Sequence, residues 1–384
     1  MDIFNKKIII ATHYLVYGAS QALREYLINN KIKKLIFIAH PLKIDETQSY
    51  VENIINGKVQ NEQKTRLKSK IPVFNYLLET YLTLRWALKE KEKFDLFVGV
   101  DCLNAFTGII LKKLNKVKKV IFYTIDYVPK RFDYQILNNI YHWVGKFCVK
   151  NADEVWNVSP RIAEGREKIR GLKQNIYNKQ KVVPIGVWFD RVRRLPFDKI
   201  EKHQLLFVGH LLEKQGVQLV LDSTPEIIKS IPDFHFLIIG GGEYEETLKK
   251  KTSDLGIEKY VTFTGWIKDR SKLDQIMADS ALAIAMYDKE KDRFTYYADP
   301  TKLKDYLSAG LPVLLTDVPH NAKEIQKRNC GLIVKPDSRS IANAVIDLIK
   351  NEEKLKQYRE NAANYAKQFD WNIIFRENLE RVLL

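Results

Sequence analysis

The chain has 384 residues, of which 45% are hydrophobic and 29% charged. This composition is that of a soluble globular protein, and it excludes a disordered, collagen-like or coiled-coil chain. The length exceeds what one ordinary core supports, so we expect two domains. The longest apolar stretches fall short of the roughly 20 residues that a membrane-spanning helix needs.

The charge is unevenly distributed along the chain. The net charge is +16, and residues 1–190 carry 32 Lys and Arg against 18 Asp and Glu, whereas residues 191–384 carry 31 against 29. The basic first half predicts an anionic partner, with nucleic acid, an anionic membrane and a phosphorylated substrate as the alternatives.

Apolar, β-branched runs alternate with helical patterns along both halves. Such runs predict parallel strands buried on both faces, and therefore two successive Rossmann-like, doubly wound α/β domains. The predicted strands are 7–13, 34–40, 96–100, 119–125, 154–159 and 182–187 in the first half, and 205–210, 234–240, 260–265, 281–286, 312–317 and 331–336 in the second.

The charged stretch 191–203 has no apolar period and precedes a fresh strand, so we interpret it as a linker. The predicted domains are therefore 1–190 and 204–366, followed by a C-terminal helical segment, 367–384. The N-terminus has no hydrophobic signal region, and three widely spaced cysteines suit free thiols. Both features predict a cytoplasmic location.

Three glycine loops follow predicted strands, where ligands of open parallel sheets bind. They contain Gly18, the pair Gly209 and Gly216, and the triplet Gly240, Gly241 and Gly242. None has the spacing of a P-loop or a dinucleotide fingerprint. Each glycine therefore serves either a ligand or only a tight turn.

The stretch 296–319 is the most informative one. Pro300 can begin a helix that carries Lys302 and Asp305 one turn apart. A lysine in the first turn opposes the helix dipole unless an anion arrives there. The pattern favours a phosphate clamp followed by an acceptor for ribose hydroxyls, with a surface ion pair between the two side chains as the alternative.

Four segments, 205–217, 236–249, 261–286 and 299–317, together resemble the nucleotide-sugar-dependent glycosyltransferases of the GT-B fold. The resemblance is to family 4 and its exopolysaccharide-assembly relatives. It implies two Rossmann-like domains that face a cleft, with the donor bound by the second domain and a C-terminal helix around Trp371 that crosses back to the first.

The family's donor-binding positions are partly changed. His210 stands at the family's Arg position, and Gln215 stands at its Lys position with Lys214 beside it. Tyr297 replaces the first of the family's two glutamates, and Asp305 replaces the second. In the polysaccharide-assembly relatives a Pro-x-Lys precedes that second position and its Lys binds diphosphate, which Pro300-Thr301-Lys302 resembles. The resemblance thus implies a donor site at Gly209, His210, Lys214, Gly241, Gly242, Tyr297, Thr301, Lys302 and Asp305.

On the acceptor side, Ile125 replaces a family histidine, and Asp126 follows it. Asp126 is a candidate general base, as in an inverting relative, or alternatively a turn cap. His13 and Gly18 follow the first strand and are candidate acceptor contacts. No metal-ligand spacing is present, so we expect neither metal nor cofactor. The resemblance implies a nucleoside diphosphate sugar as substrate, and we expect a UDP-sugar.

A basic run and aromatic residues lie together in residues 57–95. Lys58, Lys64, Arg66, Lys68 and Lys70 precede Phe74, Tyr76, Tyr81 and Trp86. The pattern indicates either a charged loop before a packed helix or an element that binds anionic lipid. We expect a glycosyltransferase of the hexosyltransferase type, peripheral on the inner membrane face, with a lipid-linked or glycan acceptor. The alternatives are an epimerase of the same fold and a non-enzymatic nucleic-acid or anionic-surface binding protein.

Overall fold

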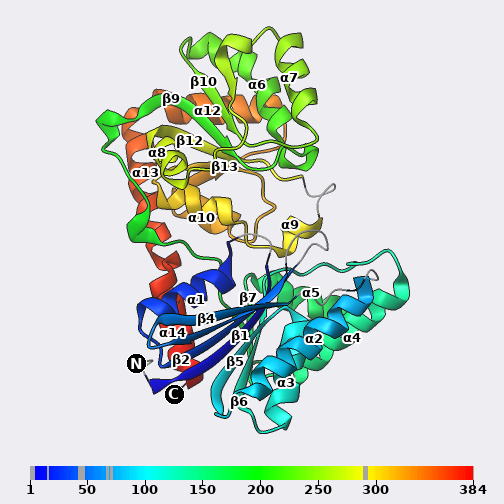
Figure 1. The fold of residues 1–384 in the computed structure, drawn as a ribbon. Helices are drawn as coiled ribbons and strands as arrows, with labels where there is room; N and C mark the ends of the chain where they lie inside the picture. The colour runs from blue at the N-terminus through cyan, green and yellow to red at the C-terminus, as the bar shows by residue number, and fades with distance from the viewer. Residues whose placement is uncertain are drawn as a thin grey trace. The chain divides into compact units, whose positions relative to one another are not determined.

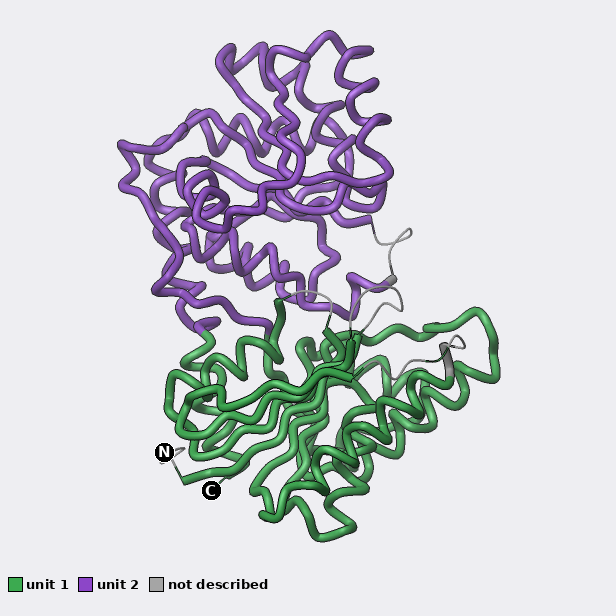
Figure 2. Tube along the Cα trace, viewed as in Figure 1, with its two compact units in different colours: residues 1–184, 371–384 green, residues 185–370 purple. Residues whose placement is uncertain are grey.

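The computed structural model describes residues 5–14, 17–41, 48–65, 69, 72–288 and 293–383. The chain divides into two compact units: unit 1 comprises residues 1–184 and 371–384, and unit 2 comprises residues 185–370 (Figure 2). Each unit is a mainly parallel sheet covered by helices, so the prediction of two doubly wound α/β domains is confirmed.

Unit 1 contains an eight-stranded sheet in the order β4-β3-β2-β1-β5-β6-β7-β8. Its strands are β1 (Lys7–Tyr14), β2 (Lys34–Pro41), β3 (Ser49–Ile55), β4 (Lys58–Thr65), β5 (Phe94–Val100), β6 (Val117–Thr124), β7 (Glu154–Asn157) and β8 (Gln180–Val182). The central strands are fully buried apolar runs, as a parallel sheet covered on both faces requires. The last strand lies earlier than the predicted 182–187 and shares only Val182 with it.

The edge hairpin of β3 and β4 is absent from the predicted strands. Both strands pair antiparallel, and the turn at Asn56 and Gly57 has positive φ at both residues, which is the geometry of a type I′ hairpin. Strand β4 is solvent-exposed along almost its whole length, so it lacks the apolar signal of the buried strands. Lys58 and Lys64, predicted to lie either in a charged loop or in a lipid-binding element, belong to this strand. Arg66, Lys68 and Lys70 lie outside the described residues.

The helices of unit 1 cover both faces of its sheet (Figure 1). Helices α2, α3 and α4 lie along one face, and α1 and α14 lie along the other. The helices are α1 (Ala19–Asn29), α2 (Pro72–Lys89), α3 (Cys102–Lys113), α4 (Gln135–Asn151), α5 (Pro160–Arg170) and α14 (Trp371–Leu383).

Helix α14 is the C-terminal segment and packs on unit 1. Arg381 donates two hydrogen bonds, of 2.7 and 3.1 Å, to the carboxylate of Glu154 at the start of β7. The Phe375 ring lies 5.6 Å from that of Tyr26 on α1. A bidentate arginine–carboxylate pair beside an aromatic contact orients the helix as well as holding it.

Unit 2 contains a six-stranded, all-parallel sheet in the order β11-β10-β9-β12-β13-β14. Its strands are β9 (Glu201–Val208), β10 (His235–Ile239), β11 (Val261–Phe263), β12 (Ser280–Ala285), β13 (Val313–Leu315) and β14 (Gly331–Ile333), and all six were predicted. Its helices are α6 (Val217–Ser230), α7 (Glu245–Asp254), α8 (Arg270–Asp279), α9 (Arg293–Tyr297), α10 (Thr301–Ser308), α11 (Ala322–Lys327), α12 (Ser338–Lys350) and α13 (Glu352–Ala366).

Residues 191–203 are part of unit 2 rather than a linker. They contain the short 3₁₀ helix η3 (Phe197–Lys199) and the first residues of β9. Val192 is buried with the core beneath α10, and Arg194 donates a hydrogen bond of 3.0 Å to the carbonyl of Ser308. The apolar side chains that anchor this stretch alternate with charges, which hides them from a test of periodicity. The division between the units lies at Pro184 and Ile185, earlier than the predicted boundary at 190.

No helix in the described ranges of the chain is both long enough and apolar enough to span a bilayer.

Candidate functional site

The strand order of the unit 2 sheet reverses between β9 and β12. These two strands are neighbours in the sheet, although three α-helices and two strands separate them in sequence. At such a switch point the loops after the two strands part and leave room for a ligand at their carboxyl ends. The loop after β9 begins at Gly209. Helix α10 brings its first turn to the same place.

Lys302 of α10 reaches the loop after β9. Its Nζ lies 2.8 Å from Oε1 of Gln215, which belongs to the short 3₁₀ helix η4 (Glu213–Gln215). A Cβ at Gly209 would stand 2.9 Å from the same Nζ, and Gly209 has φ of +150°. Glycine at this position therefore makes room for the lysine. Gly209, Gln215 and Lys302 form one cluster, which we call the lysine cluster.

The amine of Lys302 makes no ion pair within the described part of the chain. Nζ of Lys302 lies 4.3 Å from the centre of the Phe207 ring and 5.5 Å from that of Tyr287. Desolvation by this surrounding protein lowers the pKa of Lys302 to about 7. An amine in such surroundings is stabilised by an arriving anion, and the first N–H groups of α10 lack intrahelical acceptors. The arrangement suits a phosphate.

This pKa predicts that diphosphate binding depends on pH. A bound diphosphate should raise the pKa of Lys302, so binding above pH 7 must take up close to one proton. Affinity for a nucleoside diphosphate should then fall by about tenfold per pH unit from pH 7.5 to 9, until the pKa of the complex is reached. Calorimetry in two buffers of different ionisation enthalpy measures the uptake. Lys302→Arg, which remains charged, should remove both effects, and equal proton uptake by this variant would contradict the assignment.

Two contacts fix α10 against the sheet. The Tyr306 hydroxyl accepts a hydrogen bond of 2.7 Å from the backbone N–H of Val208, the last residue of β9. At the start of the helix, the buried carboxylate of Asp299 pairs with the buried Lys304 and lies 3.1 Å from Nε2 of His320. Burial alone would raise the pKa of Asp299, but Lys304 and His320 outweigh burial and lower it. The first turn of α10 is thus held rigidly beside Gly209.

The glycine triplet after β10 allows a close approach between the backbones of two loops. A Cβ at Gly240 would lie 1.8 Å from the carbonyl oxygen of Gly209, and one at Gly242 would lie 2.4 Å from that of Leu211. The backbone N–H of Leu211 donates to the carbonyl of Gly241 at 3.1 Å. The two loops therefore touch main chain to main chain, and only glycine permits this approach. Gly241 and Gly242 remain donor-contact candidates through their backbone groups.

His210 and Trp266 form an exposed aromatic pair next to this triplet. Their ring centres lie 4.7 Å apart, edge to face, and a Cβ at Gly241 would meet Nε1 of Trp266 at 2.8 Å. His210 is accessible to a ligand. Lys214 lies on η4, and its carbonyl accepts a hydrogen bond of 3.1 Å from the N–H of Asp288 after β12.

Asp305 does not pair with Lys302, so the predicted alternative of an ion pair within the helix is wrong. Its Oδ1 lies 2.8 Å from the guanidinium of Arg270 at the start of α8, and Arg270 also binds Asp274. Thr301 is the first residue of α10 and is exposed. Tyr297 ends α9, with its ring edge-to-face on Tyr296 at 5.1 Å.

Unit 1 has its own switch point, between β1 and β5. His13, near the end of β1, lies between two carboxylates: its Nδ1 is 2.6 Å from Oδ2 of Asp101 after β5, and its Nε2 is 3.0 Å from Oε2 of Glu79 on α2. Burial would lower the pKa of His13, but Asp101 and Glu79 together raise it to about 10. His13 is therefore a cation at neutral pH and cannot accept a proton there.

Asp101 has a strained backbone conformation, and both oxygens of its carboxylate form hydrogen bonds. Its φ of +71° is unusual for a residue other than glycine, and such strain is concentrated at functional sites. Its Oδ1 accepts hydrogen bonds from the N–H groups of Leu103 and Asn104 at the start of α3, and His13 lowers the pKa of its carboxyl against the effect of burial. A carboxylate held ionised by so many donors is a weak base.

Asp126 has the opposite environment. It follows β6 with a solvent-accessible carboxylate that makes no hydrogen bond or ion pair within the described part of the chain. The protein around it removes hydration and raises the pKa of its carboxyl; Arg131 opposes this effect, and Asp101 adds to it. An unpaired carboxylate with a raised pKa is the better general base of the two.

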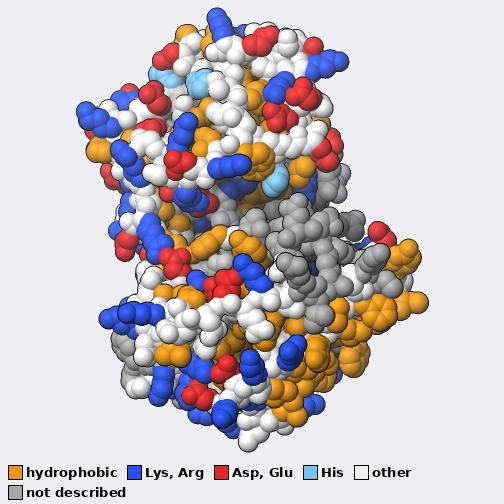
Figure 3. All heavy atoms as spheres, viewed as in Figure 1, with side chains coloured by type: hydrophobic (Ala, Val, Ile, Leu, Met, Phe, Trp, Pro, Cys, Tyr) orange, Lys and Arg blue, Asp and Glu red, His pale blue; other side chains and the backbone are white. Residues whose placement is uncertain are grey.

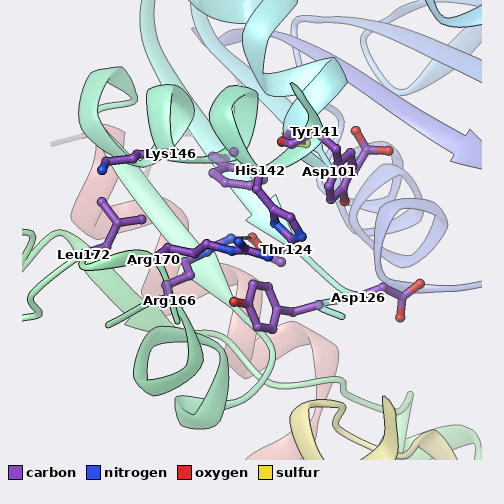
Figure 4. A pocket seen from close by; sticks show the side chains of 13 residues that line it. Asp101, Thr124, Asp126, Tyr141, His142, Lys146, Arg166, Arg170 and Leu172 are labelled. Carbon is purple, nitrogen blue, oxygen red and sulfur yellow. Dashed lines mark hydrogen bonds between the residues drawn. The ribbon is translucent and has the colours of Figure 1, made fainter. Parts of the chain in front are cut away.

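A small pocket lies beside Asp126 (Figure 4). His142 of α4 and Arg166 and Arg170 of α5 gather there, whereas the carboxylate of Asp126 points away from the two arginines. Arg166 is buried, and the acceptors of its hydrogen bonds are the neutral side chains of Asn157, Gln180 and Thr124. The cavity volume is about 30 Å³, which is close to that of one water molecule. The pocket therefore supplies positive charge near Asp126 and is too small to enclose a sugar.

Gly18 has a structural role in unit 1. It caps the start of α1, where its N–H donates to Oε1 of Gln21 at 3.0 Å. Its φ of −153° is extended backbone, so its conformation does not require glycine. His13 is the acceptor-side candidate that lies at the switch point.

Sequence reasoning missed Asp101, Glu79, Arg270 and Trp266. Asp101 directly follows a buried strand, which is a usable signal for a residue at the ligand-binding edge of a sheet. Glu79 is the single carboxylate of α2, and nothing in its spacing points to His13. No group of three or more side chains arranged to hold a metal ion occurs among the described residues.

Comparison with known proteins agrees with this geometry. Residues 193–365 match the family described as glycosyl transferases group 1. A phosphatidyl-myo-inositol mannosyltransferase of Mycobacterium leprae is 23% identical over 198 residues, which cover 50% of each chain. An uncharacterized glycosyltransferase of Methanocaldococcus jannaschii is 25% identical over 296 residues, which cover 71% of this chain and 70% of the relative. The chain spans about half the length of the mycobacterial relative that it matches.

The solved structures agree with the fold. Anabaena HepE in complex with UDP superposes with a TM-score of 0.71 over 98% of this chain and 99% of its own, at 14% identity. The chain has the GT-B fold, and its residues 193–365 are similar to the glycosyl transferases group 1 family. Its glycosyl transferases group 1 region lies entirely within unit 2, the unit that carries the lysine cluster. The family resemblance predicted from the four sequence segments is thereby confirmed.

Proposed function

We propose that this GT-B protein is a hexosyltransferase that moves a sugar from a nucleoside diphosphate sugar, with UDP-sugars favoured, to a lipid-linked or glycan acceptor. The observation that carries the proposal is the buried amine of Lys302 at the start of α10, which makes no ion pair among the described residues and lies within the glycosyl transferases group 1 region. The epimerase alternative has no support from the relatives.

The donor would bind unit 2. Lys302 and the first N–H groups of α10 would contact the diphosphate, with His210, Lys214 and the glycine backbone around it. As the bond between the sugar C1 and the diphosphate oxygen breaks, negative charge grows on the leaving diphosphate. Fixed positive groups at that place stabilise this charge without reorganisation, which is the largest catalytic contribution in many enzymes.

The acceptor would bind unit 1. Asp126 would take the proton of the acceptor hydroxyl while the acceptor oxygen forms the new bond to C1. The raised pKa of Asp126 suits this role, and the nearby arginines suit an anionic acceptor. His13 would orient Asp101 and keep it ionised rather than act as a base.

The membrane part of the proposal rests on two observations. Residues 1–190 carry an excess of 14 positive charges, and an anionic membrane surface attracts such an excess. The mycobacterial relative is named for a phosphatidyl-myo-inositol acceptor, which is a membrane lipid. We therefore propose a peripheral position on the cytoplasmic membrane face.

A thermal-shift screen of UDP-, GDP- and ADP-sugars tests the function, because a ligand that binds the folded state stabilises it by RT ln(1 + [L]/Kd). One class of nucleotide sugar should raise the melting temperature, and incubation with lipid extract should then release the nucleoside diphosphate. No stabilisation by any nucleotide sugar would contradict the proposal.

Asp305→Ala tests the nucleotide's orientation. We expect Asp305 to accept the ribose hydroxyls, so its loss should weaken ribonucleotide binding by roughly 10- to 100-fold, as loss of a charged hydrogen bond does. Binding of the 2′,3′-dideoxynucleotide should barely change. Asp274→Ala is the matched control, because it removes the other carboxylate partner of Arg270. If Asp305→Ala weakens binding of the dideoxynucleotide as much as binding of the ribonucleotide, Asp305 does not contact the ribose hydroxyls.

A further inference from the structure

The helices α2, α3 and α4 of unit 1 carry exposed apolar side chains in stripes. On α4, Ile136, Ile140 and Trp143 recur at helical spacing, with exposed fractions of 74%, 55% and 62%. On α2, Phe74, Leu77 and Tyr81 recur likewise, and Leu77 is 63% exposed. Figure 3 shows hydrophobic side chains gathered where Figure 1 places these helices. We call this the helix face.

The helix face has almost no acidic residue. The three helices carry Arg85, Lys89, Lys112, Lys113, Lys146 and Lys150, but a single carboxylate, that of Glu79. Glu79 is turned inward onto His13 and is mostly buried. The exposed charges within the three helices are therefore all positive, whereas an ordinary water-facing surface mixes both signs.

Five of the six cations of this face have no ion-pair partner among the described residues. Within the described part of the chain, Arg85, Lys89, Lys113, Lys146 and Lys150 make no ion pair, whereas Lys112 pairs with Asp153. Their charges are therefore available to an external anion.

Aromatic rings and lysines are arranged together on the face. Trp143 stacks on Phe147 with ring centres 6.0 Å apart, and Nζ of Lys113 lies 5.6 Å from the Phe147 ring. Tryptophan rings and lysine stems of this kind occupy the headgroup level of a bilayer, where apolar and charged surroundings meet.

We propose that the helix face docks on a bilayer that contains anionic lipids, with the apolar stripes inserted among the headgroups and the five unpaired cations on the lipid phosphates. This inference deepens the proposed function by assigning its membrane contact to α2, α3 and α4. It moves the contact away from the basic run at 57–70. The described lysines of that run, Lys58 and Lys64, lie on the exposed strand β4, and Lys64 pairs with Glu62.

Cosedimentation of the full chain with vesicles tests this docking. The wild type should bind phosphatidylcholine vesicles that contain 30% phosphatidylglycerol and not those of phosphatidylcholine alone. Ile140→Glu with Trp143→Glu should lower the partition coefficient by about tenfold or more. Lys146→Glu with Lys150→Glu should also lower it, and added salt should weaken the wild type in the same direction.

The matched control is Ile169→Glu with Ile176→Glu, two exposed isoleucines of unit 1 outside the three helices. This control should bind vesicles as the wild type does. The shift in melting temperature with nucleotide sugar, measured on every variant, reports folding and the donor site independently. If nucleotide sugar does not raise the melting temperature of the wild type, the proposed function is contradicted. The vesicle-binding result still tests the docking proposal in that case.

Three outcomes would overturn the docking proposal. In the first, the variant with Ile140→Glu and Trp143→Glu binds anionic vesicles as tightly as the wild type does. The second is a wild type that ignores anionic vesicles but is a dimer, which the same variant converts to a monomer; the face would then be a self-association surface. The third is loss of binding on Lys64→Glu alone, which would return the membrane contact to the basic run.

Discussion

Replacement of Asp126 by asparagine should lower turnover by about 10²- to 10⁴-fold and leave donor affinity unchanged. Asparagine keeps the shape of the side chain but cannot accept a proton, and this range is what a general base contributes. The raised pKa of the Asp126 carboxyl and its lack of a described partner place it closer to the working pH than Asp101. Single-turnover rates with saturating donor and acceptor measure the effect.

Asp101→Asn is the comparison for this prediction. It breaks the pairing with His13 and should lower the melting temperature, because a buried histidine that is charged at neutral pH loses a counter-charge. Asp126→Asn should leave the melting temperature unchanged. The configuration of the product at C1, read by NMR, gives a second measure: a general base on the acceptor implies inversion. Retention together with normal turnover of Asp126→Asn would make Asp126 structural.

Lys302→Ala should weaken nucleoside diphosphate binding by roughly 10- to 150-fold, which corresponds to about 1.5–3 kcal/mol for a lost charge-assisted contact. Binding of the corresponding nucleoside should be unchanged, because the lost amine would contact the phosphates. Turnover should fall further than affinity, since the charge on the leaving diphosphate is greatest in the transition state. Titration calorimetry with the diphosphate and the nucleoside measures the difference.

Gln215→Ala is the control for Lys302. It removes the 2.8 Å hydrogen bond that positions Nζ but leaves the charge, so its effect on diphosphate binding should be smaller. It should also preserve the proton uptake above pH 7, which Lys302→Ala should abolish. Equal weakening of diphosphate and nucleoside by Lys302→Ala would show that the lysine supports the fold of the site and does not contact phosphate.

The sequence by itself determined the two-sheet architecture, all six strands of unit 2 and the resemblance of the second half to glycosyltransferases. Buried parallel strands are continuous apolar runs, so their signal is local and survives without an alignment. Strand β4 was missed because an exposed edge strand has no such run, and β3 was missed because its buried positions alternate with less buried ones, although Asn56-Gly57 carries the type I′ turn signal. The packing of residues 191–203 into unit 2 was missed because their buried side chains alternate with charges.

The tertiary structure alone decided the partners of the charged groups. Lys302 and Asp305 stand three residues apart, but one binds Gln215 and the other Arg270, because two elements that are distant in sequence contact α10 at different residues. His13 lies between Asp101 and Glu79, which are 88 and 66 residues away. Likewise, only the fold turned Glu79 inward and left α2, α3 and α4 with an apolar, basic face. A pKa or a surface charge depends on which groups converge in space, and residue spacing along the chain does not specify that convergence.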